Sequence, residues 1–126
     1  MKKKIIILAT LIIVILIGAV FIYKISLKTN NKIDKVMTIN DVKFSKAKIE
    51  KKNNKYFFTV QLDYAGENAT KAESFDANIL DKSGNSIEVL SGYIGGIEQT
   101  SVKSITIESQ ADLSKAYSIT YTVYNE

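Results

Sequence analysis

The stretch DANILDKSGNSIEV, residues 76–89, contains the side chains that most resemble a metal-binding loop. Two Asp, two Asn and a Ser fall within ten positions, and carboxylate, hydroxyl and amide oxygens are the ligands that calcium prefers. An EF-hand loop needs more oxygen ligands and a terminal Glu between two helices, which are missing here. Asp81 and Gly84 occupy the first and fourth positions that a tight turn favours. We therefore expect residues 81–85 to be a turn between two strands, with a weak cation site at Asp81 as the alternative.

A second pattern, Ser45-Lys46-Ala47-Lys48, matches the S-x-x-K of serine acyl-transfer enzymes. That chemistry requires the Lys one helical turn from the Ser, together with S-D-N and K-T-G elements that this chain lacks. The surrounding residues alternate as a strand does, which predicts that Ser45 and Lys48 face opposite sides. An envelope hydrolase that uses Ser45 is a third functional hypothesis, and the missing elements argue against it.

Carboxylates also gather around the turn AGENATKAE. Their types suit glycoside hydrolysis, which needs a carboxylate pair across a substrate cleft, but solvated acids on loops are the interpretation we favour. These carboxylates are Asp63, Glu67, Glu73 and Asp76.

The 126-residue chain has no Cys and no His, and all 17 basic residues are Lys. Thiol chemistry and thiolate metal sites are thereby excluded, and the commonest general base is missing. We expect no catalytic residue, cofactor or metal ion.

Charge is distributed unevenly along the chain. Residues 1–35 carry seven Lys and one Asp, whereas residues 36–126 carry ten Lys and twelve acids. A nucleic-acid-binding domain usually has a basic stripe interleaved with aromatics, which the second part lacks. A basic run extends from Lys43 to Lys55, where Lys discourages pairing between sheet edges or contacts anionic lipid headgroups or wall polymers. We select Lys51, Lys52, Lys55 and Tyr93 as the candidate interaction surface, although core packing is the interpretation we favour for Tyr93.

Residues 5–23 form an uncharged apolar run of nineteen residues between Lys4 and Lys24. As a helix they span roughly 28 Å, close to the thickness of a bilayer core. A cleaved signal peptide has a shorter apolar region and small residues at its end, whereas Val20–Tyr23 are bulky. We predict an uncleaved transmembrane helix in contact with membrane lipid. Residues 1–4 form a cytoplasmic tail, which places the C-terminal domain on the extracytoplasmic side of the cell membrane.

Residues 24–35 are polar and predict a stalk, and residues 36–126 predict an all-β domain. In Tyr56–Tyr64 the side chains alternate between two faces, with Tyr56, Phe58, Val60, Leu62 and Tyr64 inward. Asn53-Asn54 supplies the hairpin turn before this strand. The apolar phase changes between Phe44 and Ala47, which predicts a β-bulge near Ser45-Lys46.

Further strands follow at intervals of about ten residues. Inward positions are expected at Phe75, Ala77 and Ile79, and then at Ile87 and Val89. The last strand turns one face inward, formed by Tyr117, Ile119, Tyr121 and Val123. About seven strands without a convincing helix predict an immunoglobulin-like antiparallel β-sandwich.

The run DANILDKSGNSIEVLSGYIGGIEQTSVKSITIES resembles the FxLYD domain, an immunoglobulin-like module of bacterial membrane-attached and secreted proteins. The named motif falls on Ala77–Asp81, where the apolar character and the Asp are retained but Ala77 and Leu80 replace the Phe and Tyr. The resemblance covers about residues 39–124. It implies a sandwich fold and no shared catalysis.

Two functional hypotheses follow. The first is a single-pass, membrane-anchored extracytoplasmic protein with a non-enzymatic interaction domain, whose partner is an envelope protein or an anionic wall or lipid surface, and not nucleic acid. The alternative is an envelope-stress or assembly accessory that acts through its membrane helix and uses the domain as a sensor.

Overall fold

The structure is a computed structural model that describes residues 31–125. The predicted cytoplasmic tail and membrane helix, and residues 24–30 of the predicted stalk, lie outside the described residues. Within residues 31–125, no helix has the length and apolar character needed to cross a bilayer. The described chain is all-β apart from one short 3-10 helix, as the sequence predicts.

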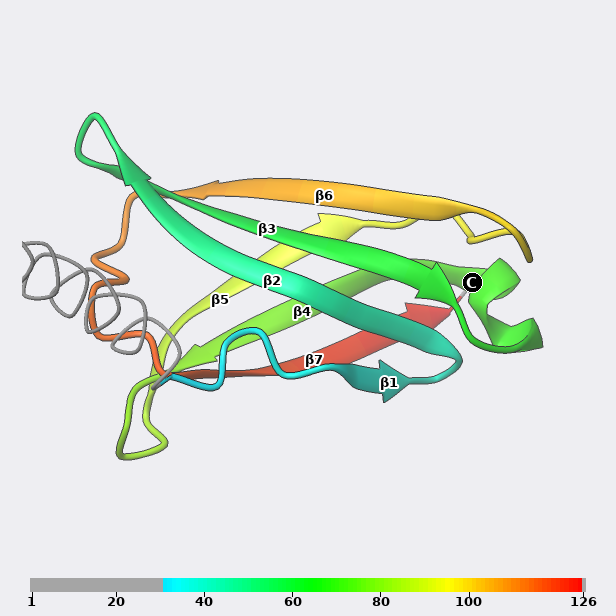
Figure 1. Ribbon diagram of the computed structural model, residues 1–126, viewed down its shortest axis with the longest axis horizontal. Helices are drawn as coiled ribbons and strands as arrows, with labels where there is room; N and C mark the ends of the chain where they lie inside the picture. The colour runs from blue at the N-terminus through cyan, green and yellow to red at the C-terminus, as the bar shows by residue number, and fades with distance from the viewer. Residues whose placement is uncertain (1–30, 126) are drawn as a thin grey trace, which may run out of the picture. The chain divides into compact units, whose positions relative to one another are not determined.

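Seven strands form two antiparallel sheets (Figure 1). They are β1 (Met37–Ile39), β2 (Val42–Lys52), β3 (Lys55–Tyr64), β4 (Ala72–Leu80), β5 (Ser86–Tyr93), β6 (Val102–Ser109) and β7 (Ser118–Asn125). Sheet A has the order β1-β2-β3-β6 and sheet B the order β5-β4-β7. The 3-10 helix η1 (Glu67–Lys71) carries the chain from sheet A to sheet B, and residues 110–117 do so again between β6 and β7. The two sheets therefore make a β-sandwich.

The core lies between the sheets and is built from the inward side chains of both. Phe44 of β2 stacks on Tyr121 of β7, with ring centroids 4.0 Å apart, and meets Phe75 of β4 edge-on at 5.4 Å. The predicted inward positions Phe58, Val60, Leu62, Phe75, Ala77, Ile79, Ile119 and Tyr121 are all buried. The Tyr121 hydroxyl is buried without a hydrogen-bond partner in the described part of the chain, and burial raises its pKa. Strand phase was thus predicted correctly in β3, β4 and β7.

Turn and bulge chemistry in sheet A also follows the prediction. Asn53 and Asn54 have φ values of 53° and 63° and close the β2–β3 hairpin. The β2–β3 register shifts between Ser45 and Lys48, and Lys46 has a φ of 53°. The predicted bulge is therefore confirmed.

The packed domain includes residues on the N-terminal side of Val36. Ile33 is buried in the core, and the Lys32 amide donates to the Tyr117 carbonyl at 2.6 Å. Asn40, just after β1, donates from its side chain to the Asn125 side chain at 2.9 Å. Residues 32–40 thus run beside β7 in the same direction, and the end of the stretch interpreted as a stalk is part of the sandwich.

Candidate interaction surfaces

The opening candidate, residues 81–85, is a closed turn. The Asp81 side chain accepts hydrogen bonds from the backbone amides of Ser83 and Asn85, each at 2.9 Å on the same oxygen. The Gly84 amide donates to the Asp81 carbonyl at 3.0 Å, and Gly84 has a φ of 85°. The predicted turn is confirmed, and one carboxylate oxygen of Asp81 is occupied by the backbone of its own loop.

The S-x-x-K residues need a correction. Ser45 pairs with Gln61 and Lys48 with Thr59, two residues apart on β3, so both side chains face the same outer side of sheet A. The expectation of opposite faces was wrong because the bulge at Lys46 adds one residue between them. The Lys48 ammonium nevertheless pairs with Glu50 at 3.2 Å, and the companion motifs of acyl transfer are still missing from the sequence.

The acids around the turn AGENATKAE do not come together. Asp63 lies on the outer face of sheet A, where Gln61 donates to its two oxygens at 3.2 Å. Asp76 lies on the outer face of sheet B, with both sheets between it and Asp63. In residues 31–125, Asp and Glu form no group of three or more arranged to hold a metal ion.

Three candidate lysines lie at the tip of the β2–β3 hairpin. All are exposed, and each has a neighbour of its own. Lys52 is 3.8 Å from a Glu50 oxygen, Lys55 is 2.9 Å from a Glu108 oxygen, and the Lys51 ammonium lies 5.7 Å from the centre of the Tyr56 ring. Surface pairs of this kind contribute only about 0–1 kcal/mol and are weakened by salt. The tip is a basic surface with loosely held counter-charges.

Behind the tip, Tyr56 joins the hairpin to residues 110–117. Its hydroxyl donates to Asp112 at 3.0 Å, and the Ser114 amide donates to the same oxygen at 3.0 Å. The hydrogen bonds from Ser114 and then from Tyr56 lower the pKa of Asp112, and nearby Lys51 also lowers it. Loss of solvation and the Asp112 bond raise the pKa of Tyr56. Asp112 therefore stays charged and holds this loop against the hairpin.

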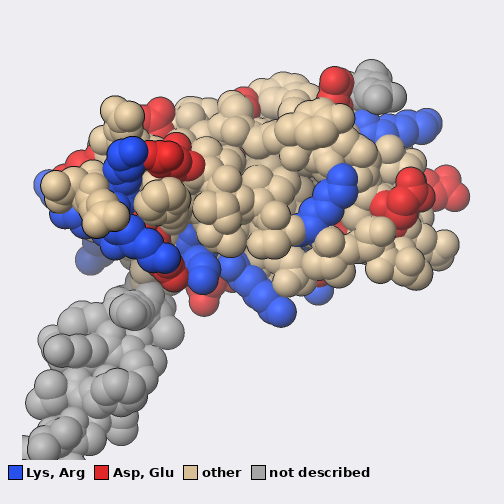
Figure 2. Space-filling model, turned by 90° about the horizontal axis from the view of Figure 1, so that it is seen from above, with Lys and Arg blue, Asp and Glu red and all other residues tan. Residues whose placement is uncertain are grey.

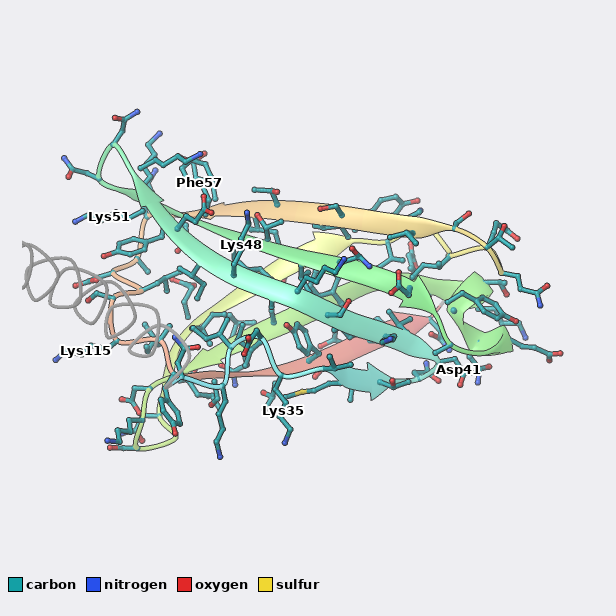
Figure 3. The ribbon with its side chains drawn as sticks, viewed as in Figure 1. Lys35, Asp41, Lys48, Lys51, Phe57 and Lys115 are labelled. Atoms are coloured by element: carbon teal, nitrogen blue, oxygen red, sulfur yellow. The ribbon has the colours of Figure 1, made fainter. Side chains whose placement is uncertain are left out.

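A shallow depression of about 370 Å³ lies beside the tip on the outer face of sheet A. Figure 3 shows Lys48 and Phe57 on this part of the hairpin, with Lys51 closer to the tip. The lining residues are Lys48, Glu50, Lys52, Phe57, Thr59 and Thr106. Two lysines on either side of one glutamate leave little net charge, so the depression has the character of a solvated sheet surface.

Tyr93 lies at the end of β5, in the other sheet, and is 74% exposed. The β4–β5 register pairs Ile79 with Glu88 but Leu80 with Ser86, so Ile87 is an extra residue. Beyond this bulge Leu90 points inward, whereas Val89 is 49% exposed. The inward assignment of Val89 was wrong, and Tyr93 shares its outward phase for the same reason.

A second tyrosine accompanies Tyr93. Both Tyr93 on β5 and Tyr124 on β7 pair with Ser74 of β4, so they flank one small residue. Because neighbouring strands are about 4.8 Å apart, the two backbones are separated by roughly 10 Å. We call this outer surface of sheet B the tyrosine face; its residues are Ser74, Asp76, Ser91, Tyr93, Thr122 and Tyr124.

Hydrogen bonds fix the middle of the tyrosine face. Asp76 accepts from the Ser91 hydroxyl at 2.6 Å and from the Tyr124 hydroxyl at 2.8 Å. The bond to Asp76 and the charge of that carboxylate raise the pKa of Tyr124, with a smaller contribution from burial. The Tyr93 ring rests over Gly95, where a Cβ would lie 2.8 Å from its Cε1 atom. The face thus presents two aromatic rings, hydroxyls and one carboxylate, with no Lys among its residues.

The structure does not unite the four predicted site residues. Lys51, Lys52 and Lys55 lie in sheet A and Tyr93 in sheet B. Sequence reasoning missed Tyr124, although the alternation that turned Tyr121 and Val123 inward also turns Tyr124 outward. Ser74 carried no recognisable signal, because its place between two tyrosines depends on pairing between distant strands.

The chain matches no protein family, no curated protein and no solved structure. The resemblance to the FxLYD domain therefore stays a prediction from the sequence.

Proposed function

We propose that this chain is a single-pass membrane protein that presents a non-enzymatic, immunoglobulin-like interaction domain on the extracytoplasmic side. The anchor is the apolar run of residues 5–23, flanked by Lys at both ends. The partner is an envelope protein, because the tyrosine face carries a carboxylate and no Lys and so does not suit an anionic polymer.

Strand pairing supports the immunoglobulin-like assignment. In that fold, strands B and E are neighbours in one sheet, and strands C and F are neighbours in the other. Here β3 pairs with β6 in sheet A and β4 pairs with β7 in sheet B. In both pairs the second strand comes three strands after the first, as E follows B and F follows C. On this comparison β4 takes the place of strand C, and β5 that of the first strand that variable-type domains add beside it.

The observation that carries the proposal is the tyrosine face. Tyr93 and Tyr124 are 74% and 47% exposed and lie on either side of Ser74. Interfaces are enriched in aromatic residues, since Tyr offers a large, rigid contact area together with a hydroxyl. Asp76 holds one of the two rings in place, which reduces the entropy lost on binding.

A photo-crosslinking amino acid tests this proposal in cells that produce the full-length protein. It replaces Tyr93 or Tyr124 in two variants, and Phe57 on the outer face of sheet A in the control. We expect the same discrete adduct from both tyrosine positions and none from the control. Equal adducts at all three positions, or none at the tyrosines, would contradict the proposal.

Two further measurements test the anchor and its direction. Protease added to intact cells should degrade the domain while a cytoplasmic protein survives; protection of both would overturn the orientation. Replacing residues 5–23 with an unrelated apolar sequence should leave the tyrosine adduct unchanged. Loss of the adduct would instead favour the accessory that acts through its membrane helix.

A further inference from the structure

One end of the sandwich gathers the lysines of four separate segments. We call this the basic end; it contains the β2–β3 tip (residues 51–55), the turn at 81–85, the β6–β7 connection (110–117) and residues 32–34 (Figure 1). Tyr117 joins the β6–β7 connection to Lys32 and to the end of β4, because its carbonyl accepts from the Lys32 amide and its amide donates to the Leu80 carbonyl. Figure 3 shows Lys51 and Lys115 at this end and Asp41 at the opposite one.

Charge separates along the long axis of the domain. The basic end has six Lys and three Asp, and Glu50 and Glu108 at its border pair with two of these lysines. The remaining residues of 31–125 have six Lys and seven acids. The six lysines are all exposed: Lys32, Lys51, Lys52, Lys55, Lys82 and Lys115. Figure 2 shows blue side chains crowded at the left end, where Figure 1 places the hairpin tip. A domain with balanced total charge thus has one positive end.

The counter-charges at this end are weakly held or used internally. Glu50 and Glu108, just outside the basic end, pair with Lys52 and Lys55 in exposed contacts that a competing anion can replace. Asp81 accepts from its own turn, and Asp112 accepts from Tyr56 and Ser114. A separate hollow of about 420 Å³ is bordered by Lys82 and Lys115 from different loops.

The same end is the one through which the chain continues toward its N-terminus. Residues 24–30, between the predicted membrane helix and Asn31, add Lys24 and Lys28 and no acid. Seven residues reach at most about 25 Å when fully extended. A tether of this length limits how far the basic end can move from a membrane that the predicted helix spans.

We propose that the basic end docks on the anionic lipid headgroups of the membrane in which the chain is anchored, which turns the tyrosine face parallel to the bilayer normal and leaves it open to a partner. This inference rests on the proposed membrane anchor. Each Lys near an anionic bilayer contributes about 1 kcal/mol, so several together hold the domain upright at moderate salt. The attraction fades within a Debye length of roughly 8–10 Å.

The test uses the full chain in nanodiscs, with one donor fluorophore on the domain and acceptor dyes on the lipid headgroups. Because the chain has no Cys, Ser83→Cys labels the basic end alone and Thr100→Cys labels the opposite end. We expect energy transfer from position 83 to be about two-fold higher in phosphatidylglycerol-rich discs than in phosphatidylcholine discs. Transfer from position 100 should be low in both.

Two triple variants distinguish the effect of where the lysines lie from the effect of the domain's net charge. Lys51→Gln/Lys52→Gln/Lys55→Gln should abolish the lipid-dependent gain at position 83, as should salt near about 1 M, where the Debye length is ~3 Å. Lys43→Gln/Lys46→Gln/Lys71→Gln removes the same charge elsewhere and should preserve the gain. Equal effects of the two triples would overturn the inference, and circular dichroism of each variant shows whether the sandwich is intact.

Two further outcomes distinguish a failure of the membrane anchor from a failure of the lipid docking. If alkaline carbonate extracts the chain from the bilayer, the anchor itself is refuted, and the docking with it. If the chain stays inserted but position 83 gives equal transfer in both lipids, only the docking is refuted. A signal that changes on adding soluble poly(glycerol phosphate), but not with lipid composition, would make a wall polymer the occupant instead.

Discussion

The strands β2 and β5 each contain a bulge, yet only the bulge in β2 could be predicted from the sequence. In β2 the apolar residues themselves change phase, from Val42 and Phe44 to Ala47 and Ile49. In β5, one phase contains Ile87 and Val89 and the other contains Leu90. Either phase of β5 could face a core, so the one-dimensional pattern does not choose between them.

The difference matters because it decides which residues reach the surface. The β2 bulge places Ser45 and Lys48 on one face, where Lys48 is exposed and Ser45 is only 8% exposed. The β5 bulge moves Tyr93 from the core side to the solvent side. An unpredicted bulge thus created half of the tyrosine face, which agrees with the frequent use of bulges to redirect side chains near functional sites.

The largest expected effect tests the phase of β5. Leu90→Asp puts an unpaired carboxylate into the core and should reduce the free energy of unfolding by at least about 4 kcal/mol. Val89→Asp, one residue away on the exposed side, should cost less than about 1 kcal/mol. Chemical denaturation followed by circular dichroism measures both. A larger loss at Val89 would mean that β5 faces the other way.

A smaller effect is expected where β5 crosses the core. A Cβ on Gly92 would lie 2.5 Å from the Phe75 ring, so Gly92→Ala should cost about 1–3 kcal/mol through displacement of that ring. In Gly84→Ala the new Cβ meets no atom within 4 Å, so any loss of stability there reflects only backbone strain at a φ of 85°. Thermal unfolding compares the two. Identical melting temperatures for Gly92→Ala and the unchanged protein would refute the tight packing.

The β2 bulge predicts a change of opposite sign. Lys46 has a φ of 53°, which Gly adopts without steric cost, so Lys46→Gly should be neutral or stabilising by up to about 1 kcal/mol. Lys46→Val should lose about 1–2 kcal/mol, because a β-branched residue is strained there. Denaturation midpoints rank the three proteins. Stabilisation by Val would show that the strand is regular at this point.

The smallest effect concerns protonation at the tyrosine face. Asp76 raises the pKa of Tyr124 because the phenolate is disfavoured beside a carboxylate that accepts its hydrogen bond. Asp76→Asn should therefore lower the pKa of Tyr124. NMR chemical shifts of the Tyr124 ring carbons, followed across alkaline pH, measure this pKa, and Tyr93 is followed in the same spectra for comparison. An unchanged Tyr124 titration would contradict the hydrogen bond.

Local patterns were sufficient for much of the fold. The alternation in Tyr56–Tyr64, the Asn53-Asn54 hairpin and the Asp81 turn each depend on residues close in sequence, and the structure confirms them. The lysine tip followed from the same hairpin. By contrast, the place of Tyr124 beside Ser74, and the meeting of Lys82 with Lys115, depend on contacts between distant segments.

The sequence by itself determined an all-β domain after residue 35, its turns, the phase of three strands and the absence of thiol and imidazole chemistry. These properties follow from side-chain types and from a period of two along each strand. Only the tertiary structure decided that Ile33 joins the core, that Tyr93 and Tyr124 share a face, and that six lysines gather at one end. The reason is physical: register, bulges and sheet order are fixed by how two apolar surfaces fill the space between them, which no single segment specifies.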